Sequence, residues 1–338
     1  MNSSAISGYV ADALDPCLVG GSRSRFAIAG ISVEVQGNDP QAADLGPQLL
    51  PFATVGDTPA DIDVQVEWSS TITPARGREL FHSGCLWNVR EFGDGFLFDF
   101  VTEHLGPKPY KRLLVDKNFQ HSRVILNQEC LTADDASRAL EYPLDELLIT
   151  HHLSLGRGVE LHSCGMVRED GESFLLVGHS GAGKSTTARL WTQHLPVEVL
   201  SDDRIIVGRT LPSDTADFCR HQINSNSVGQ ECPTHKSSHN FVMHGTPWHG
   251  EAAFASPGRA PLRRIFLLEH GPENRIERLS PGAAVGELLA RSFTPFYQSR
   301  FVDPVLALLE ELVDALPVYR FHFVPDRSAV EKILEFRD

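Results

Sequence analysis

The sequence feature that most constrains this chain is a glycine-rich stretch, GHSGAGKST, at residues 178–186. An apolar segment, SFLLV, precedes it, and a helical pattern begins near Lys184. Strand, glycine loop and helix in this order match the phosphate-binding P-loop, or Walker A motif, G-x-x-x-x-G-K-[ST]. Its glycines allow successive backbone N–H groups to face a phosphate, and the helix N-terminus adds partial positive charge. The pattern predicts an α/β domain built around a phosphate site.

The pattern also assigns roles toward Mg-ATP within this loop. Lys184 is expected to reach the β- and γ-phosphate oxygens, and the Ser185 hydroxyl is expected to ligate Mg²⁺. Backbone amides would supply most of the remaining contacts. The predicted nucleotide-binding residues are Gly178, His179, Ser180, Gly181, Ala182, Gly183, Lys184, Ser185 and Thr186.

Two adjacent aspartates follow the expected helix, in the stretch VEVLSDDRIIV at 197–207. We expect this stretch to be a strand, in which adjacent side chains point to opposite faces, so the two carboxylates would have different roles. Asp202 is expected to act as base toward an acceptor hydroxyl, and Asp203 to support Mg²⁺ beside Ser185. The sequence leaves the reverse order open. It also leaves open a polar turn without chemistry, because Asp and Ser are common turn formers.

The charge balance limits the partners. The 338 residues include 30 Lys and Arg against 44 Asp and Glu, a net charge of −14. Nonspecific binding to nucleic acid or to an anionic membrane needs a cationic face, so neither partner is expected. No apolar run reaches the roughly 18 residues of a membrane span, and the N-terminal residues lack the features of a secretory signal. With six scattered cysteines, we expect a cytoplasmic protein with reduced thiols.

Hydrophobic periodicity divides the chain into a β-rich front part and an α/β part. After a loosely ordered lead-in at 1–23, segments such as DIDVQVEW alternate at period two, which predicts a small antiparallel β-domain over 24–135. A linking helix is expected within 136–156, and a P-loop domain over 157–338. The polar stretch 209–240 is expected to be a long surface loop or a disordered insertion. Because the front domain lacks a chemical constellation, it is expected to serve recognition or assembly, or to act as a stabilising cap.

The two C-terminal helices carry start signals. In VDPVLALLEELVDAL, Asp303 is expected as N-cap with Pro304 in the first turn. In the last helix, Ser328 and Glu331 are expected to form a capping box.

Two further stretches are candidates for function. The loop at 244–264 concentrates Arg259, Arg263 and Arg264 in an acidic protein, and it could close over the γ-phosphate with Arg259 neutralising transition-state charge. The alternative is a proline-rich surface loop with solvated arginines. Within the polar insertion, a zinc site is the lesser alternative to a plain loop, because the spacings are loose. Its ligands would be Cys219, Cys232, His235 and His239.

Taken together, GHSGAGKST and the following LSDDRIIV resemble the HPr kinase/phosphorylase family, whose P-loop fold is like that of phosphoenolpyruvate carboxykinase. His162, in LHSCG, stands where that family carries a histidine ahead of its P-loop. The layout of residues 25–338 is also similar to HPr-kinase-related proteins of peptide-modification cassettes, including kinases of lasso-peptide precursors. Thr186 replaces a frequent glutamate and SDD replaces ADD, which argues against HPr itself as the substrate.

The resemblance implies ATP- and Mg²⁺-dependent phosphorylation of a serine hydroxyl in a peptide or protein. It implies Mg²⁺ and base roles for Asp202 and Asp203, and it puts His162 near the transferred phosphate. The alternatives are a regulatory ATPase that transfers phosphate only to water, and a kinase of small-molecule hydroxyls. A homo-oligomer stays open.

Overall fold

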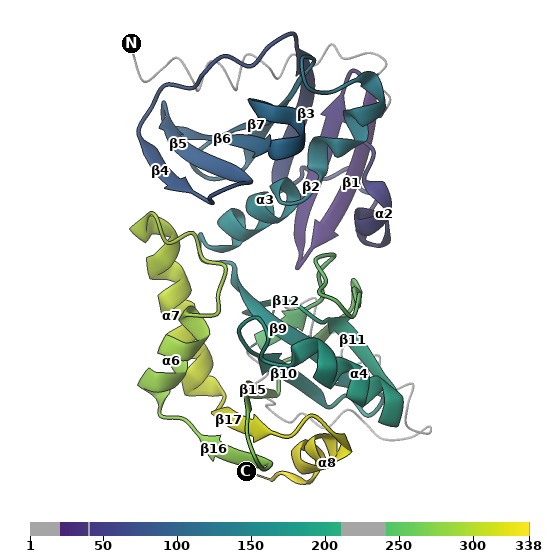
Figure 1. The fold of residues 1–338 in the computed structure, drawn as a ribbon, viewed down its shortest axis with the longest axis vertical. Helices are drawn as coiled ribbons and strands as arrows, with labels where there is room; N and C mark the ends of the chain where they lie inside the picture. Colours follow the sequence, from purple (N-terminus) through teal and green to yellow (C-terminus); the bar gives the residue numbers. More distant parts are fainter. Residues whose placement is uncertain (1–20, 40, 211–240, 338) are drawn as a thin grey trace. The chain divides into compact units, whose positions relative to one another are not determined.

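The computed structural model describes residues 21–39, 41–210 and 241–337 (Figure 1). The chain divides into two compact units, Met1–His152 and Leu153–Asp338. Each contains a mixed sheet, so the structure is α/β. Among the described residues, no helix combines the length and the apolar character needed to cross a membrane. Most of the predicted insertion at 209–240 and most of the lead-in at 1–23 lie outside the described residues.

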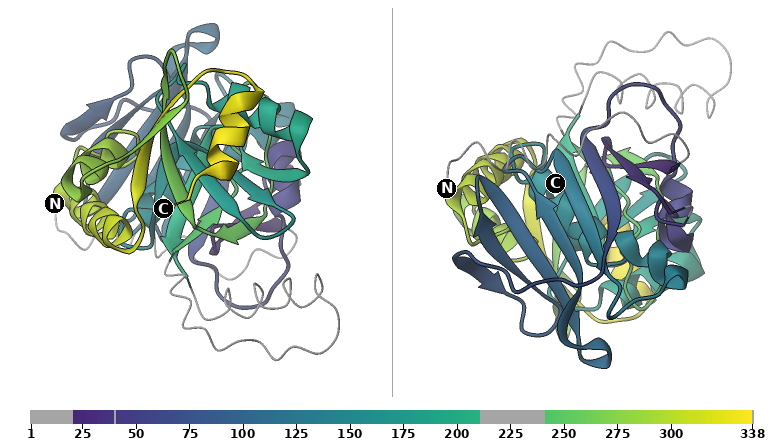
Figure 2. Two further views of the ribbon diagram at one scale, coloured as in Figure 1. Left: turned by 90° about the horizontal axis from the view of Figure 1, so that it is seen from below. Right: turned by 90° about the horizontal axis from the view of Figure 1, so that it is seen from above.

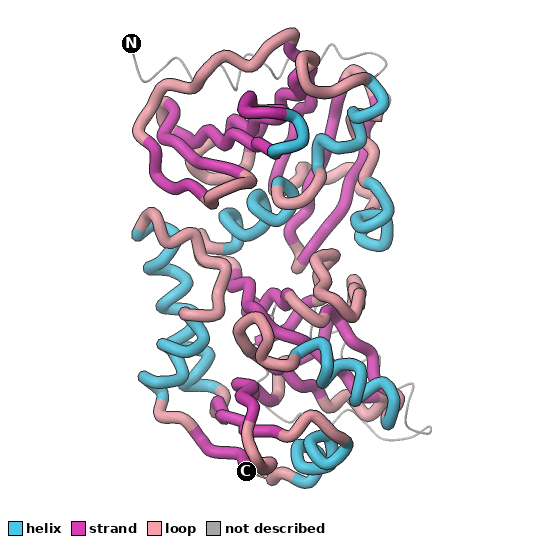
Figure 3. Tube along the Cα trace, in the orientation of Figure 1, coloured by secondary structure: helices cyan, strands magenta, loops and turns pink. Residues whose placement is uncertain are grey.

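The first unit is dominated by strands (Figure 3). Its described part forms an eight-stranded sheet in the order β1-β2-β3-β8-β7-β6-β5-β4. The strands are β1 (Ser22–Ile28), β2 (Ile31–Gly37), β3 (Ile62–Ser69), β4 (Glu79–His82), β5 (Trp87–Phe92), β6 (Gly95–Thr102), β7 (Gly106–Val115) and β8 (His121–Asn127). The helical elements are α2 (Gly46–Leu49), η1 (Leu50–Phe52), η2 (Glu103–Leu105), η3 (Ala133–Leu140) and α3 (Leu144–Leu153).

The prediction of a purely antiparallel front sheet was wrong, because β3 pairs in parallel with both β2 and β8. Parallel neighbours need a crossover connection rather than a tight hairpin. Residues 38–61, which carry α2 and η1, provide the crossover between β2 and β3. Three successive antiparallel pairs, β5–β6, β6–β7 and β7–β8, then bring the chain back, so that β8 lies beside β3 on the edge opposite β2. Local alternation of apolar residues does not reveal such long connections.

Burial follows the alternation in β3, where Ile62, Val64 and Val66 are buried. In β6 every residue from Gly95 to Phe100 is buried, so both faces of that strand are covered. Helix α3 is buried along its whole length and packs the ring of His151 on Phe119, with ring centroids 4.5 Å apart. Burial lowers the pKa of His151 to about 3. This histidine is therefore a neutral core residue.

The second unit is a mixed sheet covered by helices on both faces. Its described strands run in the order β14-β13-β12-β9-β10-β15-β17-β16, and β11 also pairs with β9. The strands are β9 (Gly158–Arg168), β10 (Ser173–Val177), β11 (Val197–Ser201), β12 (Arg204–Arg209), β13 (Phe241–His244), β14 (Arg259–Pro261), β15 (Arg264–His270), β16 (Arg275–Arg278) and β17 (Val318–Phe323). The helices are α4 (Lys184–His194), α6 (Pro281–Leu289), α7 (Ser299–Ala315) and α8 (Arg327–Glu335).

Two hydrophobic cores lie on opposite faces of this sheet. Helices α6 and α7 pack on one face through residues such as Leu288 and Leu308, and α4 and α8 pack on the other through Trp191 and Ile333. Figure 2 shows α6 and α7 on one side of the strands and α4 with α8 on the other. Strands β10, β15 and β17 are parallel neighbours. Their carboxyl ends therefore meet at one edge, where ligands bind in open α/β sheets.

Both predicted helix starts near the C-terminus were wrong. Helix α7 begins at Ser299, with Gln298 as N-cap, so Pro304 lies inside the helix rather than in its first turn. Helix α8 begins one residue before Ser328, and the carboxylate of Asp326 accepts the Ser328 backbone N–H. Gln298 is not a favoured N-cap type and forms no side-chain capping bond, so the start of α7 has no local signal. At the start of α8, Asp326 and Ser328 are both favoured N-cap types, and the local sequence does not decide between them.

Candidate active site

The glycine loop joins β10 to α4, as predicted, and its backbone requires glycine. Gly181 and Gly183 have φ values of 79° and 95°, which other residues rarely adopt. A Cβ added to Gly183 would lie 2.6 Å from Cζ of Phe323, and one on Gly178 would lie 2.7 Å from Cβ of Ala182. The loop is thus a close-packed turn that ends where α4 begins, at Lys184. Its backbone N–H groups therefore lie beside the N-terminus of this helix, where anions bind.

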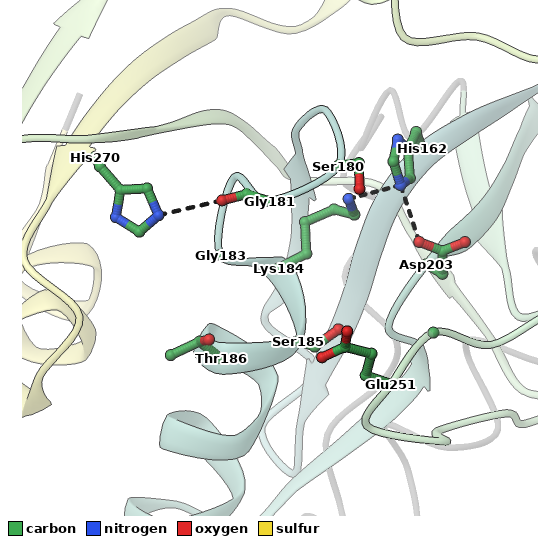
Figure 4. Close-up of a pocket in the computed structure, with 11 residues that line it drawn as sticks. His162, Ser180, Gly181, Gly183, Lys184, Ser185, Thr186, Asp203, Glu251 and His270 are labelled. Carbon is green, nitrogen blue, oxygen red and sulfur yellow. Dashed lines mark hydrogen bonds and ion pairs between the residues drawn. The ribbon is translucent and has the colours of Figure 1, made fainter.

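Lys184 is buried at the start of α4 and points toward His162 in the middle of β9 (Figure 4). Its Nζ donates hydrogen bonds to the carbonyl oxygens of Gly178 (3.0 Å) and His179 (3.2 Å) and lies 2.8 Å from Nε2 of His162. Burial lowers the pKa of Lys184 to about 8, and the nearby Asp203 carboxylate opposes that shift. A cation that is costly to bury is thus held beside the glycine loop.

Asp202, and not Asp203 as predicted, lies beside Ser185. The Ser185 hydroxyl donates a hydrogen bond of 2.8 Å to Oδ2 of Asp202. This carboxylate is fully buried and also accepts the backbone N–H groups of Gly250 (3.0 Å), Ala252 (3.0 Å) and Phe254 (3.2 Å). Its two oxygens therefore accept hydrogen bonds from four donors.

The reason for the exchanged positions is a break in the strand that was expected to be continuous. β11 and β12 both pair antiparallel with β9, but the pairing shifts register near Ser201. The Ser201 hydroxyl accepts the backbone N–H groups of Asp203 and Arg204, each at 3.2 Å, and donates to the carbonyl oxygen of Trp248 at 3.0 Å. This bend directs Asp202 inward toward α4 and leaves Asp203 on the pocket.

Asp203 forms the other half of the site with His162. Nε2 of His162 lies 2.9 Å from Oδ1 of Asp203, and Arg204 forms an ion pair with the other carboxylate oxygen. Burial, the largest single influence, favours the neutral acid, but the His162 hydrogen bond and the Arg204 and Lys184 charges together hold the pKa of Asp203 below its usual value. Because one ring nitrogen either accepts or donates, the tautomer of His162 decides whether it pairs with Lys184 or with Asp203.

A second layer of residues holds His162 and Arg204 in place. The backbone N–H of His162 donates to the carbonyl oxygen of Arg291 at 2.8 Å, and its ring meets the ring of Phe293 edge-on at 5.8 Å. The Arg204 guanidinium lies 4.4 Å from the centre of the same Phe293 ring, and its Nε is 3.5 Å from Oε1 of the buried Glu160. Neither Arg204 nor Phe293 was predicted from the sequence. Only Arg204 carried a signal, because it directly follows the aspartates.

The predicted role of Arg259 does not fit the structure, because Arg259 is not among the described residues that line the pocket. It lies on β14, in register with His244 of β13. Arg264 is also occupied elsewhere, since it donates to the carbonyl oxygen of Phe336. The 244–264 loop nevertheless reaches the site, but through the backbone around Gly250 and through Glu251 rather than through its arginines.

These residues surround a pocket of about 260 Å³. In Figure 4, His162 and Asp203 lie at one end, His270 at the other, and the glycine loop between them. The pocket is lined by His162, Ser180, Gly181, Gly183, Lys184, Ser185, Thr186, Asp203, Gly250, Glu251 and His270.

The oxygen atoms near Ser185 are too few to hold a metal ion by protein ligands alone, but they suit Mg²⁺, which needs few protein ligands. Among the described residues, no group of three or more His, Cys, Asp or Glu side chains is arranged to hold a metal ion. Mg²⁺ typically takes one or two protein oxygens and completes its shell with water and phosphate oxygens. The hydroxyl of Ser185 and the carboxylate of Asp202 offer such a pair. The zinc candidates Cys219, Cys232, His235 and His239 lie outside the described residues.

No protein-family model matches this chain, and no curated protein matches it. What the site can do chemically follows from its own geometry: a glycine cradle, one buried lysine, and two carboxylates with different surroundings.

Proposed function

We propose that this chain is an ATP-dependent kinase with a P-loop domain of the HPr-kinase and phosphoenolpyruvate-carboxykinase type, and that it phosphorylates a serine hydroxyl of a peptide or protein. One observation carries the proposal: adjacent carboxylates have separate surroundings. Asp202 is buried against Ser185, whereas Asp203 lines the pocket with His162 and Lys184. A kinase needs one carboxylate on the metal side and one that orients the nucleophile. A simple polar turn needs neither.

The nucleotide would bind along the glycine loop. The backbone amides of Gly178–Thr186 would surround the phosphates, and Lys184 would pair with the β- and γ-phosphate oxygens. Ser185 and Asp202 would hold Mg²⁺, which would neutralise charge on those oxygens. The cradle supports this assignment, because a Cβ at Gly178 or Gly183 would overlap its neighbours and change the loop.

Asp203 would receive the proton of the acceptor. As the serine oxygen bonds to the γ-phosphorus, the bond to the β,γ-bridging oxygen breaks, ADP leaves, and the hydroxyl proton passes to a carboxylate oxygen of Asp203. Asp203 is ionised and ready for this because its ion pair with Arg204 and its contact with His162 outweigh the effect of burial on its pKa. A weak base suffices, since the transition state is loose and needs mainly positioning.

The acceptor class rests on the resemblance to HPr kinases and their relatives in peptide-modification cassettes. Thr186 and Ser201 depart from the HPr kinase pattern, so we propose a peptide or protein other than HPr. All residues that line the pocket come from the second unit, and we assign recognition or assembly to the first. We also propose a cytoplasmic location, in keeping with Cys85, Cys130 and Cys164, which are free thiols, and no nucleic-acid partner, in keeping with the charge of −14.

The test is phosphate transfer from Mg-ATP to a library of serine-containing peptides, read by mass spectrometry, with Lys184→Ala as the inactive control. A phosphoserine product that requires Lys184 is the expected result. ATP hydrolysis without any phosphopeptide would favour the regulatory ATPase instead. Transfer only to small alcohols would favour a small-molecule kinase. Unchanged Mg-ATP affinity and turnover in Lys184→Ala would show that the glycine loop is not the nucleotide site.

A further inference from the structure

An aromatic pair adjoins the glycine loop at the end of the pocket away from Asp203. His270, the last residue of β15, stacks on Phe323, the last residue of β17, with ring centroids 4.9 Å apart and planes inclined by 28°. Phe323 is fully buried, whereas His270 is exposed and lines the pocket. We propose that the outer face of the His270 ring is the platform on which the nucleotide base stacks. This inference rests on the proposed nucleotide-binding function.

The direction of the phosphate chain leads to this end of the pocket. Transfer requires the γ-phosphate to lie near Lys184 and Asp203, so the nucleoside must extend the other way along the loop. Figure 4 shows Thr186 and His270 on the side of the loop opposite His162 and Asp203. Thr186 follows Ser185 in the first turn of α4, and its backbone N–H would face the α-phosphate. The base then falls on the side where His270 lies.

The size of the pocket points to an open base subsite. Ligand pockets that enclose a whole small molecule span roughly 300–1,000 Å³. The pocket here measures about 260 Å³, which is below that range. The phosphates would therefore be enclosed, and the base would lie at the rim. Stacking on an exposed ring suits such a position, because every base has a flat π-face and needs no surrounding cavity.

The platform is rigid, which favours stacking. Nε2 of His270 donates to the carbonyl oxygen of Gly181 at 3.3 Å, so the ring is tied to the glycine loop. Behind it, the N–H of Gly271 donates to the carbonyl oxygen of Phe323 at 3.1 Å, which joins the ends of β15 and β17. A Cβ at Gly183 would lie 3.3 Å from Cε1 of His270, so the loop packs directly on the ring edge. Little side-chain freedom remains to be lost when a base binds.

The same hydrogen bond gives the rival explanation, namely that His270 only holds the loop. The two roles differ in the ligand they affect. A residue that only holds the loop would serve any triphosphate, whereas a platform serves only a triphosphate that carries a base. Comparing Mg-ATP with Mg-tripolyphosphate, which has no nucleoside, therefore separates them.

The experiment measures both affinities by calorimetry for the full chain, for His270→Ala and for His270→Phe. We expect His270→Ala to weaken Mg-ATP binding about tenfold, as for the loss of one stacked base, and to leave Mg-tripolyphosphate within about twofold. His270→Phe keeps a flat ring but loses the bond to Gly181, and it should restore most of the Mg-ATP affinity. His194→Ala, at the far end of α4, is the matched control for removal of an exposed histidine.

Three results would overturn the platform while leaving the proposed function intact. These are equal losses for both ligands in His270→Ala, no loss for either, or failure of His270→Phe to recover Mg-ATP binding while tripolyphosphate still binds. Absence of binding of both ligands to the parent chain would instead remove the proposed function, and the platform with it.

Discussion

Ser185 donates its hydroxyl hydrogen to Asp202 across 2.8 Å, although Asp203 was the predicted neighbour. Asp202 has no exposed surface and accepts three backbone N–H groups from the 250–254 segment as well. The carboxylate left facing the pocket is Asp203. The two adjacent carboxylates therefore have different surroundings, Asp202 against Ser185 of α4 and Asp203 beside His162.

The glycine loop can be tested with two matched substitutions. Gly183→Ala and Gly171→Ala both place a side chain at positive φ, at 95° and 81°, which costs roughly 1–2 kcal/mol of unfolding free energy. At Gly183 the new Cβ would overlap Phe323, whereas at Gly171 no described atom beyond the adjacent residues lies within 4 Å. We expect Gly183→Ala to lose more stability in urea titrations and to lose Mg-ATP binding. Equal stability and intact binding in the two variants would contradict a close-packed phosphate cradle.

Deprotonation of Lys184 should reduce kcat/KM for Mg-ATP at basic pH. Its pKa is lowered to about 8 by burial, and only the charged ammonium attracts phosphate. Well below pH 8 the lysine of the unliganded chain is charged, so kcat/KM for Mg-ATP should be constant there and fall as the pH rises through about 8. The assignment can be checked by the ¹³Cε shift of Lys184 in NMR, identified by its loss in Lys184→Arg. A lysine that titrates near its ordinary value of 10.5 would refute the effect of burial.

His151 should make the chain sensitive to acid. Burial lowers its pKa to about 3 in the folded state, against an ordinary value of 6.5. Between these values the unfolded chain binds one more proton than the folded chain, so stability falls as pH falls below 6.5, by up to about 1.4 kcal/mol per pH unit. His151→Phe removes the titrating group while keeping a ring against Phe119. Urea titrations at pH 7 and pH 5 should show a smaller loss in the variant, and an equal loss in both proteins would argue against a neutral buried histidine.

Local sequence signals were sufficient to predict the strand, glycine loop and helix, but not the residues that contact them. The GHSGAGKST pattern predicted a strand, a loop and a helix that begins at Lys184, because all three are encoded within a few consecutive residues. The environment of Asp202 depends on amides about fifty positions downstream and on the Ser201 bond to Trp248. No periodicity reports such contacts. The sequence therefore identified the two aspartates but did not decide which of them lies beside Ser185.

Contacts between distant segments also explain why Arg259 was expected at the site in place of Arg204. The three arginines within 259–264 favoured Arg259 as a site residue. In the structure Arg259 lies on β14, which pairs with β13, and Arg204 forms the ion pair with Asp203. The parallel pairing of β3 with β2 and β8 was likewise hidden, because it depends on a crossover and not on the alternation within β3. Pairing between distant strands decides both cases, and the sequence of one strand does not show its partner.

The most direct test of the kinase mechanism is the rate of γ-phosphate transfer by Asp203→Asn, measured with its Mg-ATP affinity and compared with Asp202→Asn. Replacing Asp203 removes the proton acceptor but leaves the Ser185–Asp202 pair intact. We expect near-parental Mg-ATP affinity and a transfer rate reduced roughly 10²–10⁴-fold. Asp202→Asn, which puts an NH₂ group among four donors, should instead weaken Mg-ATP binding and lower the unfolding free energy by about 1–3 kcal/mol. Parental transfer by Asp203→Asn would contradict the assignment of Asp203 as the base.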